Sequence, residues 1–292
     1  MKKIDFVYHD GEFVRGEKSD FDCRKNPKGV FETMRSYNGC IFMLESHLKR
    51  LRSACILLGV KPPDIRNLKI SISTCMKMNR VKNARIRLTA VACGKRLCIG
   101  LSVSRICGKA QGIKGYRIMV VNSPRRNVTV LSCVKSIRRE FYDRLYLKAQ
   151  SAGYDEAIFL NVGGFVVEGA RTNVFLLKNG RLCTPALSVG CLPGITRSIV
   201  FKLARQGAVA VRQEGCISVA DLMRADEVFV TNAVIGIMPV LAINGKPFGR
   251  GRPGEITSRF IKSYRAIIRR ETAKPFTGKE FRLRKSVKED KM

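Results

Sequence analysis

The sequence has no tryptophan, only two histidines and few acidic residues in a chain of 292. Zinc sites are built from clustered cysteines and histidines, and none of the eleven cysteines forms a Cys-x-x-Cys pair. We therefore expect no metal site. The cysteines are interpreted as reduced, mostly buried apolar residues, because free cysteine is among the residue types most often buried.

Long apolar runs are also missing, since no stretch approaches the ~20 residues that cross a bilayer. The start, Met-Lys-Lys-Ile-Asp-Phe-Val-Tyr-His-Asp, lacks the apolar core and the cleavage site of a secretory signal. A chain of this length with 45% hydrophobic residues can nevertheless bury a substantial core. We expect a soluble, cytoplasmic protein.

The shortage of acidic residues leaves a formal net charge of +32, from 55 lysines and arginines against 23 aspartates and glutamates. Such an excess can mark a nucleic-acid-binding protein. Here the basic residues are spread from Lys2 to Lys291, aromatic residues are few, and no nucleic-acid-binding motif is present. We do not expect specific nucleic-acid binding and keep it as a remote alternative.

Turn signals and the spacing of apolar residues predict an α+β fold with two domains. We expect a small N-terminal domain, a polar glycine-rich connector, a larger domain and a basic, disordered tail over residues 1–107, 108–115, 116–273 and 274–292. The small domain is predicted to contain strands Ile4–Tyr8, Glu12–Arg15, Gly29–Tyr37, Cys40–Leu44, Ala84–Val91 and Arg96–Ser104, and helices Glu45–Leu58 and Ile65–Met78. The large domain is predicted to contain strands Tyr116–Asn122, Val128–Val134, Ala157–Asn161, Phe165–Glu168, Asn173–Leu177, Arg181–Thr184 and Glu227–Thr231, and helices Ile137–Gln150, Thr196–Gln206 and Pro253–Arg270.

Two charged residues stand at the ends of predicted strands. Lys135 follows the apolar run Val128–Val134, and Glu168 follows Phe165-Val-Val. An isolated lysine or glutamate is more often an exposed residue, but a lysine after a buried strand needs a reason, because desolvating an ammonium is costly. An amine and a carboxylate in these places suit an aldehyde cofactor with a basic ring nitrogen. The amine forms a Schiff base, and the carboxylate keeps the ring protonated.

A phosphate site is predicted further along the chain. Leu192-Pro-Gly-Ile-Thr-Arg197 opens a helix, which offers the backbone N–H groups of Ile195 and Thr196 and the positive end of the helix dipole. A buried dianion needs several donors. We expect more of them from the segment Thr231, Asn232 and Ala233.

In this order, these parts resemble the class IV aminotransferases, the fold-type IV enzymes that use pyridoxal 5′-phosphate (PLP), from about Gly11 to Ser263. Lys135 stands where the family signature places the PLP lysine. The resemblance implies that Glu168 pairs with the pyridine nitrogen, that Asn173 helps to order that loop, and that Arg50 reaches the cofactor phosphate. It also implies a two-domain fold with the cofactor between the domains, and a homodimer.

The substrate is less well specified by the resemblance. Branched-chain aminotransferases usually have Phe-Glu-Gly and Gly-Thr-Ala-Ala where this chain has Phe-Glu-Thr33 and Thr-Asn-Ala-Val234, and many have a tyrosine near Arg139. These departures are more similar to the 4-amino-4-deoxychorismate lyases, which eliminate pyruvate to give 4-aminobenzoate for folate synthesis. Both functions stay open. Transamination of a branched-chain-like amino acid to a 2-oxo acid such as 2-oxoglutarate comes first because it is the more general activity. The candidate substrate residues are Phe31, Thr33 and Arg139.

Overall fold

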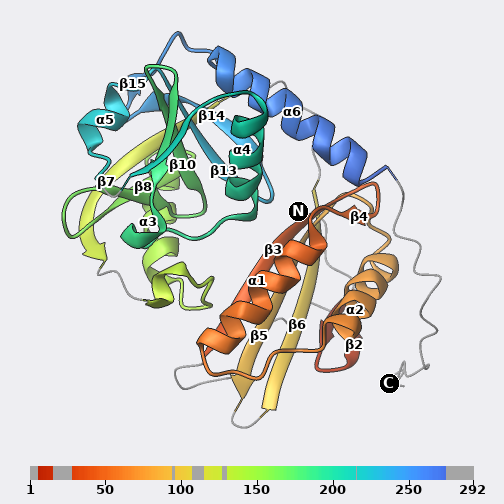
Figure 1. The fold of residues 1–292 in the computed structure, drawn as a ribbon. Helices are drawn as coiled ribbons and strands as arrows, with labels where there is room; N and C mark the ends of the chain where they lie inside the picture. Colours follow the sequence, from red (N-terminus) through yellow and green to blue (C-terminus); the bar gives the residue numbers. More distant parts are fainter. Residues whose placement is uncertain are drawn as a thin grey trace. The chain divides into compact units, whose positions relative to one another are not determined.

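A computed structural model describes residues 6–15, 28–93, 96–106, 115–126, 130–214 and 216–273 (Figure 1). The chain divides into two compact units. The first unit comprises residues up to Gly108 together with Lys135–Arg138 and the chain from Ile268 onward, and the second comprises Lys109–Val134 and Arg139–Ile267. Apart from Gly115, the expected connector over 108–115 lies outside the described residues, as does the expected tail over 274–292.

The first unit contains an antiparallel sheet with the strand order β2-β1-β6-β5-β3-β4. The strands are β1 (Phe6–His9), β2 (Glu12–Arg15), β3 (Gly29–Tyr37), β4 (Cys40–Ile41), β5 (Ala84–Cys93) and β6 (Arg96–Arg105). The two helices α1 (Leu44–Leu57) and α2 (Ile65–Met78) complete this core. Its largest fully buried side chains are Met34, Leu48, Leu51, Ile72, Ile86, Leu88 and Leu101.

Strand β3 follows from its sequence, because Val30, Met34 and Ser36 alternate with outward-facing residues and are buried, and Glu32 in the same alternating set is buried with them. At its end, Asn38 and Gly39 both have positive φ, as a two-residue hairpin turn requires. The predicted return strand Cys40–Leu44 is too long, since β4 ends at Ile41 and α1 begins at Leu44. The chain turns early because Met43 adopts the left-handed conformation immediately before the helix.

The second unit contains a larger, mixed sheet with the order β12-β11-β10-β13-β14-β7-β8-β9, and β15 also pairs with β14. Its strands are β7 (Tyr116–Arg126), β8 (Glu156–Asn161), β9 (Val166–Gly169), β10 (Asn173–Lys178), β11 (Arg181–Pro185), β12 (Val211–Glu214), β13 (Glu227–Asn232), β14 (Gly236–Ile243) and β15 (Lys246–Pro247). The helices are α3 (Glu140–Ser151), α4 (Ile195–Gln206), α5 (Val219–Met223) and α6 (Glu255–Glu271), whose last residues belong to the first unit. Phe175 and Phe229 stack in its core with ring centroids 5.0 Å apart.

The predicted strand Val128–Val134 is wrong where the structure describes it. Residues Val130–Cys133 form a short 3-10 helix, η1. The preceding strand β7 already pairs with β14 on one edge and β8 on the other, so an apolar run that follows it has no open edge there. The predicted helix Ile137–Gln150 also starts too early, because α3 begins at Glu140.

The segment after η1 extends the sheet of the first unit instead. The backbone N–H of Phe31 donates to the carbonyl of Lys135 at 2.9 Å, and the N–H of Ile137 donates to the carbonyl of Gly29 at 3.1 Å. Val30 and Ser136 form an antiparallel bridge between them. A Cβ at residue 29 would lie 2.9 Å from the carbonyl oxygen of Ala90 on β5 and 2.8 Å from the Ile137 side chain, so the start of β3 between these neighbours favours glycine.

None of the helices in the described part of the chain combines the length and the apolar character needed to cross a membrane. In that same part, no cluster of histidine, cysteine or acidic side chains could hold a metal ion. The eight cysteines described are all free thiols. Four of them, Cys55, Cys75, Cys183 and Cys191, are buried.

Candidate active site

Lys135 belongs to the first unit, where its main chain is paired with the start of β3. Its Nζ lies 4.7 Å from the ring centroid of Phe31, a distance at which the ring face attracts a cation. Phe31 itself is buried. The predicted lysine is therefore held by its backbone and positioned over a fixed aromatic ring.

Phe31 and Thr33, both predicted to contact substrate, lie on the same side of β3. On the neighbouring strand β5, Thr89 is opposite Phe31 and Arg87 is opposite Thr33. The Arg87 guanidinium carbon lies 4.1 Å from the Phe31 ring centroid. The sequence analysis missed Arg87, although its alternation with buried Ile86 and Leu88 was a sign that it faces away from the core.

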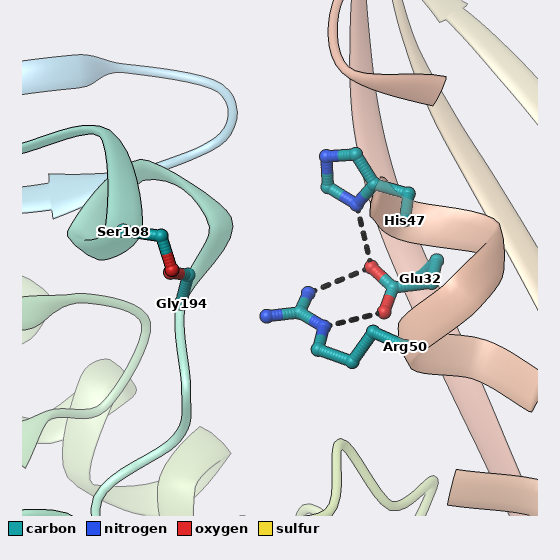
Figure 2. A network of polar contacts seen from close by, with 5 residues as sticks. All are labelled: Glu32, His47, Arg50, Gly194 and Ser198. Carbon is teal, nitrogen blue, oxygen red and sulfur yellow. Dashed lines mark hydrogen bonds and ion pairs between the residues drawn. The ribbon is translucent and has the colours of Figure 1, made fainter. Parts of the chain in front are cut away.

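The opposite side of β3 faces α1 and carries Glu32. Arg50 Nε donates to Glu32 Oε1 and Arg50 Nη2 donates to Glu32 Oε2, each at 2.7 Å (Figure 2). His47 Nδ1 lies 2.8 Å from Glu32 Oε2. Glu32 and His47 are each 1% exposed, so the network is buried. Neither Glu32 nor His47 was among the predicted site residues.

Glu168 is the penultimate residue of β9 in the second unit and is 6% exposed, which excludes the interpretation as an ordinary exposed strand residue. Its Oε2 accepts from the backbone N–H of Leu192 at 2.9 Å and from Asn173 Nδ2 at 3.2 Å. Asn173 Nδ2 also donates to the carbonyl of Leu192 at 2.9 Å. A carboxylate held in this way has a fixed orientation.

The turn that joins β9 to β10 is organised by a second buried carboxylate, Glu156. Its oxygens accept from the backbone N–H groups of Ala157 and Arg171 and from the Thr172 hydroxyl. A side chain at Gly169 would collide with Thr172 and Glu156. Burial raises the pKa of Glu156, and these hydrogen bonds oppose that effect. The sequence analysis gave Glu156 no role.

Ile195 and Thr196 are the first two residues of α4, as predicted for a helix that starts at a phosphate site. The N-cap is Gly194, and no side-chain hydrogen bond from the described residues caps the helix. A Cβ at residue 194 would collide with Asn173 Oδ1. Asn173 therefore packs against the start of the helix and also holds Glu168. The Ser198 hydroxyl donates back to the carbonyl of Gly194 at 3.2 Å (Figure 2).

Thr231 is the cross-strand neighbour of Asn173. Its hydroxyl is buried and, within the part of the chain that the structure describes, has no hydrogen-bond partner. Asn232 shapes the following turn, because its Oδ1 accepts from the backbone N–H groups of Val234 and Ile235. Ala233 lies in that turn.

Arg139 precedes α3 in the second unit. Its Nη2 donates to the carbonyl of Ala170 at 3.0 Å, and its Nε lies 3.5 Å from Asp143 Oδ1. Burial lowers the pKa of Arg139, and the nearby Asp143 opposes this effect. In these contacts Arg139 supports the turn after Glu168, and no described contact tests the predicted role in substrate binding.

The predicted site residues therefore fall into two groups. The first unit carries Lys135, Arg50, Phe31 and Thr33, and the second carries Glu168, Asn173, Ile195, Thr196, Thr231, Asn232, Ala233 and Arg139. In the second unit, Asn173 connects the carboxylate, the start of α4 and the strand that bears Thr231. An uncapped helix N-terminus and an unsatisfied buried hydroxyl suit an anionic group, and a fixed carboxylate suits a basic ring nitrogen. The residues present thus fit PLP.

The family model for amino-transferase class IV matches residues 29–243, more than half of the chain. The chain belongs to the class IV aminotransferases. A putative branched-chain-amino-acid aminotransferase of Methanocaldococcus jannaschii is 34% identical over 254 residues, which cover 82% of this chain and 86% of that protein. The branched-chain-amino-acid aminotransferase of Escherichia coli K12 is 29% identical over 295 residues, with coverage of 93% and 95%.

Solved structures of class IV aminotransferases share the fold. The branched-chain amino acid aminotransferase from Escherichia coli matches with a TM-score of 0.81 and 26% identity, over 92% of this chain and 96% of that one. The branched-chain aminotransferase from Thermoproteus uzoniensis, solved with norvaline, matches with a TM-score of 0.81 and 27% identity, over 92% and 96%. The family in general depends on PLP. Of the two activities left open by the sequence, these relatives favour transamination.

Proposed function

We propose that this class IV aminotransferase binds PLP and transfers the amino group of a branched-chain-like amino acid to a 2-oxo acid. The observation that carries the proposal is the arrangement around Asn173, which joins a buried, oriented carboxylate to an uncapped helix start and to the strand of Thr231. When bound, PLP supplies an electron sink for the bond that breaks at the substrate α-carbon.

The chain's own residues would hold the cofactor at three places. The N–H groups of Ile195 and Thr196, the Thr231 hydroxyl and the guanidinium of Arg50 would bind the phosphate. Glu168, already oriented by two donors, would keep the ring nitrogen protonated. Asn173 would fix Glu168 and the start of α4 together, and Asn232 and Ala233 would shape the turn beside Thr231.

Lys135 has two tasks in this proposal. Its amine would anchor the cofactor, and once released it would take the proton from the substrate α-carbon as a base and then, as an acid, pass it to the cofactor rather than back to that carbon. The backbone pairing of the Lys135 segment with β3 limits the region that Nζ can reach. A positioned base of this kind contributes about 10²–10⁴ to a rate.

The proposed substrate class is supported by the relatives and by the side of β3 that carries Phe31 and Thr33. The M. jannaschii and E. coli relatives carry branched-chain names, and the apolar ring of Phe31 would suit an aliphatic side chain. Arg87, beside Phe31 and Thr33, would attract the carboxylate of a dicarboxylic acceptor such as 2-oxoglutarate. We further propose that the enzyme is a cytoplasmic homodimer.

Two assays test the activity. The purified enzyme, incubated with leucine and 2-oxoglutarate, is expected to form glutamate, and incubated with 4-amino-4-deoxychorismate it is expected to release no pyruvate. Pyruvate release without glutamate formation would show that the protein is a 4-amino-4-deoxychorismate lyase instead of an aminotransferase. Binding of DNA or RNA with a steep salt dependence and no turnover would favour the remote alternative of a nucleic-acid-binding protein.

Covalent attachment is expected at Lys135. Borohydride reduction of the yellow holoenzyme should leave a pyridoxyl group on the peptide that contains Lys135, as mass spectrometry would detect. Lys135→Ala should lose turnover and the label while keeping its circular dichroism spectrum. The matched control is Lys178→Ala, which removes a lysine paired with Asp221 on the surface and should keep both. A label on another lysine, or a fully active Lys135→Ala variant, would contradict the assignment.

A further inference from the structure

The guanidinium of Arg50 is oriented by a carboxylate that water scarcely reaches. Two parallel hydrogen bonds of 2.7 Å join Arg50 to Glu32, one to each carboxylate oxygen (Figure 2). This fork geometry fixes both the position and the plane of a guanidinium. It uses two of the five N–H donors that an arginine carries.

Glu32 is in turn fixed by His47, which lies one helical turn before Arg50 on α1. Burial alone would raise the pKa of Glu32, but the charge of Arg50 and the hydrogen bonds from His47 and Arg50 outweigh burial and lower the pKa to about 2. Glu32 is therefore ionised at neutral pH and can only accept. It follows that His47 Nδ1 is the donor in its 2.8 Å contact with Glu32 Oε2.

A carboxylate beside a proposed phosphate ligand has two opposing effects. Its negative charge offsets that of Arg50 and repels a phosphate, which weakens binding. Its two parallel hydrogen bonds hold the long, flexible Arg50 side chain in one orientation. Phosphate binding then costs less side-chain conformational entropy. The network in Figure 2 favours the second effect, because all three contacts are short and both Glu32 and His47 are buried.

We infer that Glu32 and His47 are positioning residues that hold the Arg50 guanidinium ready for the cofactor phosphate. The inference rests on the proposed function, in which Arg50 binds that phosphate. His47 acts on Glu32, Glu32 acts on Arg50, and neither positioning residue contacts the cofactor.

The two effects predict opposite changes in PLP affinity for Glu32→Gln, which keeps the shape of the side chain and removes its charge. If orientation dominates, PLP affinity of the full-length protein, measured by titration after removal of the cofactor, should fall about tenfold. If charge offset dominates, the affinity should rise. Pyridoxal, which lacks the phosphate, should bind Glu32→Gln and the parent equally well.

His47 supplies a second test that does not depend on the folding of the Glu32 variant. Asparagine places an amide N–H near the position of Nδ1, so His47→Asn should keep most of the PLP affinity, whereas His47→Leu should lose several-fold. The matched control is Glu45→Gln. Glu45 precedes His47 on the same helix and forms an exposed ion pair with Lys69, so its loss should not change PLP affinity.

A double mutant separates this inference from the proposed function. If Glu32 acts through Arg50, Glu32→Gln should have no further effect on PLP affinity in an Arg50→Ala background. An equal loss in both backgrounds, or a rise in affinity in Glu32→Gln, would overturn the inference alone. Unchanged PLP affinity in Arg50→Ala would overturn both the inference and the phosphate role of Arg50.

Discussion

Glu156 and Glu168 are two buried carboxylates on neighbouring strands with different tasks. Glu156 accepts three hydrogen bonds from its own strand and from the turn after β9, and so holds that turn. Glu168 accepts from Leu192 and Asn173, which belong to the proposed cofactor site. The residue types alone did not separate these roles, because the sequence marks both as an acid in or beside an apolar strand.

Replacing Glu168 by Gln should keep the shape of the side chain and remove the charge partner of the proposed ring nitrogen. We expect removal of the substrate α-proton to slow by orders of magnitude, since loss of one charged contact in a water-excluded site costs about 3–4 kcal/mol. Exchange of the α-proton of leucine in deuterium oxide, followed by NMR, measures this step. PLP should still bind. Exchange at the rate of the parent would show that Glu168 only supports its strand.

Removal of the Thr231 hydroxyl is expected to change stability and PLP affinity in opposite directions. A buried hydroxyl without a partner costs about 1–3 kcal/mol, so Thr231→Val, which keeps the shape, should raise the melting temperature of the cofactor-free protein. If the hydroxyl donates to the phosphate, the same change should lower PLP affinity about tenfold. A variant in which both quantities rise, or neither changes, would show that the hydroxyl does not serve the cofactor.

At the scale of single elements, β3 links most of the first unit's site. One side carries Thr33 and Phe31, whose ring lies beside Lys135, and the other carries Glu32 and its bonds to α1. The boundaries of β3 and α2 were predicted correctly, because alternation and helical spacing are local signals. The conformation of Val128–Val134 was not predictable in the same way. The segment that follows it pairs with β3, which lies about a hundred residues earlier in the sequence, and no local pattern signals such a pairing.

The contact between β3 and α1 should depend on pH. The folded pKa of Glu32 is about 2, below its ordinary value of 4.5, so its contribution to stability is present above pH 4.5 and is lost as the pH falls toward 2. That contribution is on the order of 3 kcal/mol. Urea midpoints measured between pH 5 and pH 2.5 should fall more steeply for the parent than for Glu32→Gln. The exposed Glu45→Gln control should follow the parent, and parallel curves for all three proteins would contradict the prediction.

At the scale of the whole molecule, the family was predictable, whereas the internal contacts of the site were not. Lys135 and Glu168 occur in local strings of apolar residues and glycines that carry the resemblance. The bonds of Asn173 to Glu168 and Leu192 depend on side-chain orientations that no local pattern specifies. The network of Glu32, His47 and Arg50 likewise needs the packing of a helix on a sheet.

The chain passes between the two units at residues 108–109, 134–135, 138–139 and 267–268. The first unit therefore depends on residues far from its own N-terminal stretch. Lys135–Arg138 pair with β3, and Thr272, at the end of α6, is buried. We expect a fragment of residues 1–108 to lack a cooperative unfolding transition by circular dichroism and to be digested quickly by trypsin. A stable, protease-resistant fragment would contradict this dependence.

This connectivity also sets the order of events during synthesis. Domains generally fold from the N-terminus as the ribosome releases them, but here the N-terminal sheet waits for its edge segment until residue 138 has emerged, and for its last buried residues until residue 272 has emerged. A premature stop between residue 139 and α6 would leave both units unfinished. We expect such a truncated chain to be degraded rather than to persist as a folded half of the protein.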